Sequence, residues 1–365
     1  MHSSTTLFLD ASAMAQLVHR IGLQQCIQAM STRIQQEFLR WNSFEKSVRM
    51  AFHSQDGVIE LMPITNGKTF SIKYVNGHPR NTDVGLPTVM AFGLLSDVAT
   101  GAPRLICELT LLTAIRTAAM STLAAKHLAR PESRTMALIG NGAQGEFQAL
   151  AFWDSLGIRR LRVFDSDVMA TAKLVSNLKN IDLEIQAASS AAEAAAGADI
   201  ITTITAAKER AAIITPDMLT PGMHLNAVGG DCPGKTELHP EVLQRSRVFV
   251  EYEPQSRVEG DVQQMPADFP VTEIWEVLAG RKIGRDSPEQ ITIFDSVGFA
   301  LEDYAAMAYV LEAAFQWGIG QGVDLVAQTE DPKNLFELIN PLAQSRNGHS
   351  CVKAPREDSA FSLPA

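Results

Sequence analysis

The sequence predicts an α/β protein in which a doubly wound, mostly parallel sheet is joined to a second domain of the α+β class. Residues 130–300 alternate strand-like apolar runs with helix-like segments, which is the pattern of βαβ units. A glycine-rich turn, Gly140-Asn-Gly-Ala-Gln-Gly145, follows one such apolar run and opens a helical segment. Residues 1 to about 128 lack this alternation and combine long helices with strands and polar turns.

In the first region we expect a helix from about Met14 to Leu39, followed by strands that include Val58–Met62 and Thr69–Val75. A second helix is expected from Leu109 to Leu128, and Pro131 marks its end because proline breaks a helix. This helix would lead into the parallel sheet.

The middle of the chain supplies the parallel strands and the helices between them. Two helices are expected, at 168–180 and 191–196. Strands are expected at 134–140, 160–165, 183–187, 197–205, 223–228 and 247–251. A doubly wound sheet binds its ligand at the carboxyl ends of such strands.

The end of the chain turns helical again, from Leu301 to Trp317, and this helix is apolar enough to be buried. We expect it to bridge the two domains or to return to the first. The predicted division is therefore residues 1–128 with about 305–350 as one domain, residues 129–304 as the second domain, and residues 351–365 as a tail.

Composition narrows the class of function. The 365 residues are 46% apolar and 20% charged, as in an ordinary globular protein, and are enough for two domains. The net charge of −10 and the pI near 5.3 disfavour nucleic acid or an anionic membrane as a partner. No apolar run could span a bilayer, and no secretion signal is evident, so a cytoplasmic location is expected. The four cysteines are scattered, no histidine pattern indicates a metal site, and no metal is expected.

The glycine turn has the G-x-G-x-x-G spacing of a Rossmann-type dinucleotide site. Gly140 permits the tight turn, Gly142 lets the backbone approach a pyrophosphate, and Gly145 lets helix and strand pack closely. The pyrophosphate would lie at the positive end of the helix that follows. The same spacing also occurs in ordinary strand-to-helix turns, but here the next strand ends in an acid, Asp165, at the distance expected for a ribose contact.

Asp165 favours NAD over NADP, because its carboxylate would accept from a ribose 2′-hydroxyl and repel a 2′-phosphate. Arg159, Arg160 and Arg162 lie close by in the sequence, and one of them could instead reach a phosphate. Solvated charge at the start of a strand is the simpler interpretation of these arginines.

Two charged residues stand out from their surroundings. Asp231 lies in a glycine- and proline-rich turn directly after an apolar strand, where α/β sheets hold their chemistry, although it could also be a turn-capping acid. Arg116 lies in an otherwise apolar helix, where an unpaired cation costs several kcal/mol, so we expect an anion beside it. That anion could be a ligand or a structural acid.

Together these features resemble the ornithine cyclodeaminase/μ-crystallin family, from Arg49 to beyond Asp295. The most specific match is the run Gly-Gly-Asp231-Cys-Pro-Gly-Lys235-Thr-Glu-Leu. The resemblance implies conversion of L-ornithine to L-proline and ammonia, with NAD reduced and reoxidised within each cycle, in a homodimer joined through the non-nucleotide domain.

The resemblance also implies roles for individual residues. Asp231 would be the acid/base group. Substrate contacts would come from Arg49, Glu60, Lys73, Arg116 and Val297. Contacts to NAD would come from Thr88, Arg116, Gly140, Gly142, Ala143, Gln144, Gly145, Asp165, Thr205, Val228, Gly229, Gly230, Lys235 and Ser296.

Other functions on the same fold stay open at this point. One methylene in a pocket is worth only about 1–3 kcal/mol, so lysine cyclodeamination is an alternative, as is reduction of a cyclic ketimine. An amino-acid dehydrogenase would release NADH and would leave Glu60 without a role. A dinucleotide-dependent binding protein, like μ-crystallin, would need neither Asp231 nor a full set of carboxylate-binding cations.

Overall fold

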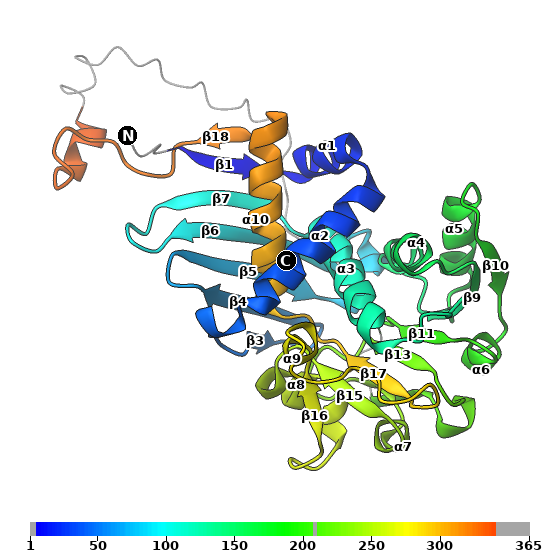
Figure 1. Ribbon diagram of the computed structural model, residues 1–365. Helices are drawn as coiled ribbons and strands as arrows, with labels where there is room; N and C mark the ends of the chain where they lie inside the picture. The colour runs from blue at the N-terminus through cyan, green and yellow to red at the C-terminus, as the bar shows by residue number, and fades with distance from the viewer. Residues whose placement is uncertain (1–4, 207–209, 341–365) are drawn as a thin grey trace. The chain divides into compact units, whose positions relative to one another are not determined.

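The computed structural model describes residues 5–206 and 210–340 (Figure 1). Residues 6–323 form one compact unit, and the described residues after Val323 belong to another. The larger unit contains two large sheets with helices packed on them, which confirms the predicted α/β class with a parallel sheet and an α+β part. The predicted tail, residues 351–365, lies outside the described residues. The division into two domains stays a prediction.

One large sheet is parallel throughout, and its order is β10-β9-β8-β11-β13-β17-β15-β16. After β8, the next two strands in the chain, β9 and β10, lie on one side of β8, and β11 pairs with β8 on its other side. The order therefore reverses between β8 and β11, which is where a doubly wound sheet binds its ligand. The strands are β8 (Thr135–Ile139), β9 (Arg160–Phe164), β10 (Glu184–Ala187), β11 (Ile200–Thr203), β13 (His224–Ala227), β15 (Arg247–Val250), β16 (Val271–Glu273) and β17 (Thr292–Asp295).

Short helices connect these strands, and the strands and helices expected between residues 134 and 251 are confirmed within a few residues. The helices are α4 (Gly145–Leu156), α5 (Val168–Leu178), α6 (Ala191–Ala195), α7 (Pro240–Gln244), α8 (Glu253–Glu259) and α9 (Ile274–Leu278). The sequence did not predict a small parallel sheet of β12 (Arg210–Ile214) and β14 (Thr236–Leu238). Single 3₁₀ turns lie at Trp41–Ser43, Pro79–Val84, Pro216–Met218, Asp261–Gln264 and Leu335–Ile339.

The other large sheet is mixed, in the order β18-β1-β7-β6-β5-β4-β2, with β3 also paired to β4. Its strands are β1 (Thr6–Leu9), β2 (Glu45–Lys46), β3 (Met50–His53), β4 (Val58–Thr65), β5 (Thr69–Gly77), β6 (Val89–Asp97), β7 (Pro103–Glu108) and β18 (Gln321–Val323). The helix α10 (Ala300–Trp317) runs across the inner face of this sheet (Figure 1).

The two faces of the mixed sheet differ because side chains alternate along a strand. On the inner face Glu60 and Lys73 are buried beside apolar neighbours. On the outer face Phe52 of β3 is 63% exposed and Phe92 of β6 is 53% exposed. The ring of Phe92 stacks on that of Tyr74 from β5. The outer face is therefore apolar and still open to solvent.

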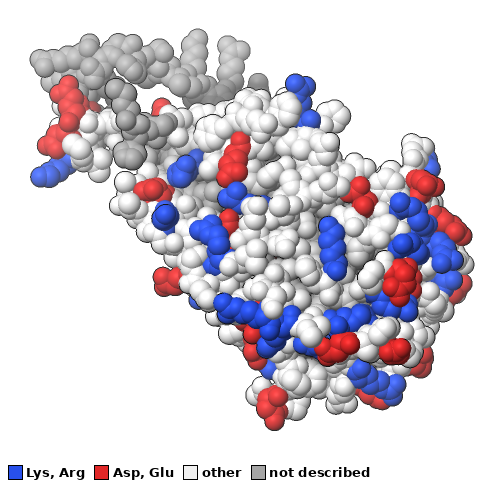
Figure 2. Space-filling model, viewed as in Figure 1, with Lys and Arg blue, Asp and Glu red and all other residues white. Residues whose placement is uncertain are grey.

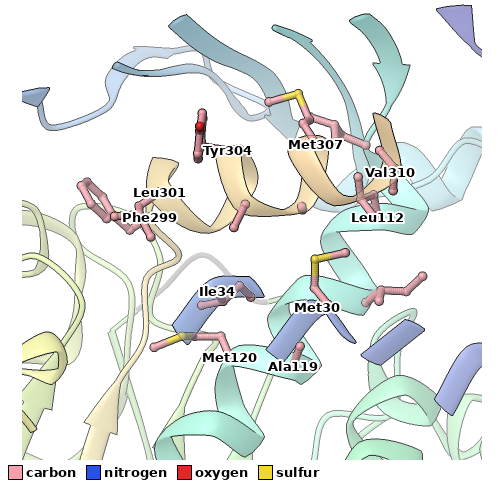
Figure 3. Close-up of a cluster of buried hydrophobic side chains, with 14 of the residues drawn as sticks. Met30, Ile34, Leu112, Ala119, Met120, Phe299, Leu301, Tyr304, Met307 and Val310 are labelled. Carbon is pink, nitrogen blue, oxygen red and sulfur yellow. The ribbon is translucent and has the colours of Figure 1, made fainter. Parts of the chain in front are cut away.

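Three further helices pack with α10 in the core: α1 (Ala11–Ile21), α2 (Leu23–Leu39) and α3 (Thr110–Leu128). The expectation of a single helix from Met14 to Leu39 is wrong, because Gly22 adopts φ +94° and separates α1 from α2. Figure 3 shows Met30 of α2, Met120 of α3 and Met307 of α10 in one apolar cluster. Since α3 is buried almost all round, its single buried arginine must find its partners inside the protein.

On the face viewed in Figure 2, basic and acidic side chains are interspersed rather than gathered into patches of one sign. No helix within residues 5–206 and 210–340 is long and apolar enough to cross a membrane. The same residues contain no group of three histidine, cysteine or acidic side chains arranged to hold a metal ion.

Candidate active site

A cavity of about 110 Å³ lies where the carboxyl ends of the parallel strands meet the inner face of the mixed sheet and helix α3. Its walls come from β4, β5, α3 and the loops after β8, β13 and β17. The structure brings nine of the predicted site residues to this cavity: Arg49, Glu60, Lys73, Arg116, Gln144, Val228, Asp231, Ser296 and Val297. Residues separated by up to 248 positions in the chain therefore share one small space.

Arg49, just before β3, connects the mixed sheet to the parallel one. Its Nη1 donates to Glu60 of β4 at 2.9 Å, and its Nε lies 2.9 Å from a carboxylate oxygen of Glu259 at the end of α8. Its Nη2 donates to the carbonyl oxygens of Val297 at 2.5 Å and Gly298 at 2.7 Å. Most of this guanidinium is thus engaged by the protein, and the remaining N–H on Nη1 is its main free donor.

Lys73 and Arg116 share one acid. Oδ1 of Asp303, in the first turn of α10, lies 3.1 Å from Nζ of Lys73 and 3.1 Å from Nε of Arg116. The neighbouring acid, Glu302, accepts from Nη1 of Arg116 at 2.7 Å. Nη2 of Arg116 donates no hydrogen bond to either acid, so it can donate to another anion. The anion expected beside Arg116 is thus present as a pair of protein acids.

Burial shifts the pKa of several groups at this site. It lowers the pKa of Lys73 to about 8, although Asp303 opposes this shift. It raises the pKa of Glu302 to about 8 and that of Glu259 to about 7, against the opposing effects of Arg116 and Arg49 respectively. The carboxyl groups of Glu302 and Glu259 therefore titrate near neutral pH.

Asp231 differs from the buried acids because its side chain is 51% exposed at the cavity edge. Its Oδ1 lies 3.2 Å from Nζ of Lys235, and the same ammonium donates to the carbonyl oxygen of Thr205 at 2.9 Å. Lys235 therefore connects the loop after β13 to the loop after β11. Asp231 itself lines the cavity, where a substrate amine could reach its carboxylate.

Two buried acids hold the loops around the cavity. Glu251 accepts from Oγ of Ser296 at 2.6 Å and from the backbone N–H groups of Val297 and Gly298. Glu237 accepts from the backbone N–H and the hydroxyl of Thr205 and from the N–H of Gly229. These contacts fix loop backbone at the carboxyl ends of three neighbouring strands.

The glycine turn has the shape its sequence predicts. Gly140 has φ +96°, and a Cβ there would lie 2.7 Å from the carbonyl oxygen of Ile204. A Cβ on Gly145 would lie 2.7 Å from Leu174, whereas one on Gly142 would meet nothing within 4 Å. The backbone therefore needs glycine at the first and third positions, and the second position faces open space where a ligand can approach.

Helix α4 begins at this turn, and no side chain caps its first N–H groups. Ala143 and Gln144 lie directly before it, and the buried Oε1 of Gln144 has no hydrogen-bond partner within the described protein. Asp165, after β9, accepts from the N–H of Asn141 at 2.6 Å. A free helix N-terminus beside a fixed carboxylate is the arrangement that binds a pyrophosphate and a ribose.

Not every predicted residue lies at the cavity. Thr88, just before β6, is not among the cavity residues, and its carbonyl oxygen accepts from the N–H of His78. Thr205, Gly229, Gly230 and Lys235 lie in the loops after β11 and β13. The individual roles assigned to all these residues stay predictions.

Sequence reasoning missed the acids that hold the cations in place, namely Glu259, Glu302 and Asp303, together with Glu237 and Glu251. A signal existed for one pair, because Arg116 required an anion and Glu302-Asp303 opens the other apolar helix. For Glu259 the sequence carries no such signal, since a glutamate that ends a short helix is ordinarily solvated.

A family model described as "Ornithine cyclodeaminase/mu-crystallin family" matches residues 11–317. The chain belongs to this family. An ornithine cyclodeaminase of Brucella suis is 52% identical over 332 residues, which is 91% of this chain and 93% of the relative. This identity extends well beyond the glycine turn and covers both sheets.

Two solved structures share this fold. A lysine cyclodeaminase, described as recognising L-lysine, L-ornithine and L-2,4-diaminobutyric acid, superposes with a TM-score of 0.86 at 30% identity, covering 93% of this chain and 99% of that chain. An archaeal alanine dehydrogenase dimer with bound NAD superposes with a TM-score of 0.80 at 30% identity, covering 88% of this chain and 99% of that chain.

Proposed function

We propose that this protein is an ornithine cyclodeaminase, an ammonia-lyase that converts L-ornithine to L-proline and ammonia with NAD recycled in each turnover. The observation that carries this proposal is the cavity itself. It combines three cations, Arg49, Lys73 and Arg116, with the acids Glu60 and Asp231, at the mouth of a dinucleotide crevice. The ornithine cyclodeaminase that is 52% identical over 91% of the chain supports the same substrate.

The residues of the glycine turn fit NAD. The open space at Gly142, the uncapped start of α4 and the carboxylate of Asp165 would hold its pyrophosphate and ribose. The orphaned Oε1 of Gln144 and the loop residue Ser296 lie on the cavity side of that crevice. When bound, NAD supplies a hydride acceptor that later returns the hydride, so the reaction involves no net oxidation.

Cations of the cavity would bind the α-carboxylate of ornithine. Lys73 has ammonium hydrogens beyond the contact to Asp303, and Nη2 of Arg116 donates no hydrogen bond to Glu302 or Asp303. The free N–H of Arg49 supplies a third donor. Charge-assisted contacts of this kind fix the carboxylate and so orient the substrate Cα toward the crevice.

Asp231 would move protons at the amines. Oxidation at Cα yields an imine, the side-chain amine attacks the imine carbon, and ammonia then leaves from that carbon. The attacking nitrogen must lose a proton and the departing nitrogen must gain one, so a single carboxylate can serve both steps. Glu60 lines the same cavity and would hold the distal ammonium until attack.

The test is turnover of isotope-labelled L-ornithine by the purified protein with a trace of NAD. Proline and ammonia are expected in equal amounts, far in excess of NAD and without accumulation of NADH. Asp231→Asn is expected to lower kcat by about 10²–10⁴-fold, with NAD binding retained.

Each rival function has its own outcome in this assay. Accumulating NADH with a 2-oxo acid would replace the proposal with an amino-acid dehydrogenase. Faster turnover of L-lysine to a six-membered cyclic product would replace ornithine as the substrate. Binding of NAD without turnover of either amino acid would indicate a binding protein.

We also propose that two copies associate through the outer face of the mixed sheet. Its exposed apolar side chains, among them Phe52 and Phe92, form the kind of surface that is ordinarily covered by a partner. The related archaeal alanine dehydrogenase is described as a dimer. Sedimentation analysis should give twice the chain mass, and a monomeric mass at micromolar concentration would contradict the proposal.

A further inference from the structure

We infer that Asp303 is a positioning residue that keeps Lys73 charged, and thereby makes binding of the substrate carboxylate possible at neutral pH. The inference rests on the proposed function, in which Lys73 contacts that carboxylate. It adds a residue outside the cavity wall to the machinery of the site, because Asp303 lies behind the two cations rather than among the cavity residues.

The geometry supports this role. One oxygen of Asp303 lies 3.1 Å from Nζ of Lys73 and 3.1 Å from Nε of Arg116. From the first turn of α10, Asp303 therefore fixes Lys73 of β5 and Arg116 of α3 relative to each other. Its other oxygen, Oδ2, is buried without a hydrogen-bond partner in the described protein, so both cations share one atom. The helix N-terminus is a favourable place for this negative charge.

The surroundings of Lys73 explain why it needs Asp303. The lysine is 1% exposed, and its partners in the neighbouring strands, Met62 and Gly93, carry no charge. The charged groups with the largest effect on it are Asp303 of α10, Arg116 of α3 and Arg49 before β3. Two of these three are cations and oppose its protonation, so Asp303 is the group that favours the charged form.

The sign of the pH effect follows from these contacts. Burial lowers the pKa of Lys73 to about 8, and the carboxylate of Asp303 acts in the opposite direction. Wild-type protein therefore holds the cation below about pH 8 and loses it above. Without the Asp303 carboxylate the pKa of Lys73 falls further, so the cation is lost at a lower pH.

The experiment compares the KM for L-ornithine of Asp303→Asn with that of the wild type between pH 6 and pH 8.5. The ionisation of ornithine cancels in the ratio of the two values. We expect the ratio to rise with pH, by up to about tenfold per pH unit over the range in which only the variant has lost the cation. Glu312→Gln, an acid of the same helix with 65% side-chain exposure, is the matched control and should give a flat ratio.

A second variant distinguishes an effect of Asp303→Asn through Lys73 from an effect through Glu302. Glu302 also contacts Arg116, and Asp303 raises the pKa of Glu302. Adding Lys73→Arg to Asp303→Asn replaces lysine with a cation that does not titrate in this range. The rise of the KM ratio with pH should then disappear. A flat ratio in the single variant, or a rise that persists in the double variant, overturns the inference.

A direct readout keeps the inference separate from the proposed function. In protein labelled with ¹³C at lysine Cε, the Lys73 signal can be assigned by its absence in Lys73→Arg and titrated in both backgrounds. We expect it to titrate at lower pH in Asp303→Asn, whatever the substrate. If ornithine is inert but this shift occurs, the proposed function fails and the Asp303 effect stands. An unchanged titration refutes the Asp303 effect even in an active enzyme.

Discussion

The two sides of the cavity are built by different means. On the side proposed to bind NAD the features belong to the backbone: a left-handed glycine at Gly140, open space at Gly142 and the uncapped start of α4. On the side proposed to bind the substrate they are buried charges, with Arg49, Lys73 and Arg116 each facing at least one buried acid. A backbone site depends on shape and does not titrate, whereas a site of buried ions depends on the balance of charge. The two sides should therefore respond differently to substitution and to pH.

The largest expected effect is on the substrate side. Arg116→Met would leave Glu302 and Asp303, which are 0% and 1% exposed, without their shared cation. Removal of one member of a buried ion cluster typically costs about 3–5 kcal/mol, because the remaining charge stays buried. Denaturant unfolding of the wild type and of Arg116→Met should show a loss in this range in the free energy of unfolding.

Arg116→Lys is the matched control, since it keeps a cation at the position while losing the forked geometry of the guanidinium. Its loss of stability should be clearly smaller than that of Arg116→Met. Equal losses would mean that packing rather than charge makes Arg116 necessary, and the contrast between the two sides of the cavity would weaken.

A smaller effect is expected on the nucleotide side. Gly140→Ala forces a Cβ to within 2.7 Å of a backbone oxygen at φ +96°, and strain of this kind costs about 1–3 kcal/mol. Gly142→Ala meets no neighbour within 4 Å, so the fold should tolerate it, while the added methyl blocks the approach of a pyrophosphate.

Thermal unfolding without cofactor and titration with NAD separate these two glycines. Gly140→Ala should lower both the Tm and the affinity for NAD, and Gly142→Ala should lower the affinity alone. A stable Gly140→Ala variant with full affinity would show that the turn is less constrained than its φ value indicates.

The sequence predicted the strands and the helix around the glycine turn well because its signals are local. Glycine spacing, an apolar strand before it and an acid at the end of the next strand all lie within residues 134–165, and β8, α4 and β9 follow them. The same holds for α3 and α10, whose apolar composition marks them as buried.

On the proposed substrate side the sequence indicated the cations, Glu60, Asp231 and Val297, but not the buried acids that hold the cations. Arg116 was conspicuous in an apolar helix, but nothing local says that its acids come from α10, 186 positions further along the chain. The position of Glu259 beside Arg49 depends on how the two sheets meet. The spacing of apolar residues along the chain does not predict this arrangement. The break between α1 and α2 at Gly22 was missed because apolar residues on both sides of Gly22 continue the helical pattern.

The alternation of side chains along β5 has a consequence for how this protein can change. Lys73 points into the site and its neighbour Tyr74 points to the outer face, so the loss or gain of one residue within the strand would exchange them. A cation would then face outward and a ring would fill the cavity. Lengthening of the turn between β4 and β5 leaves both in place. Over evolutionary time, insertions and deletions should therefore accumulate at that turn and be absent from the strand, even where substitutions in the strand are tolerated.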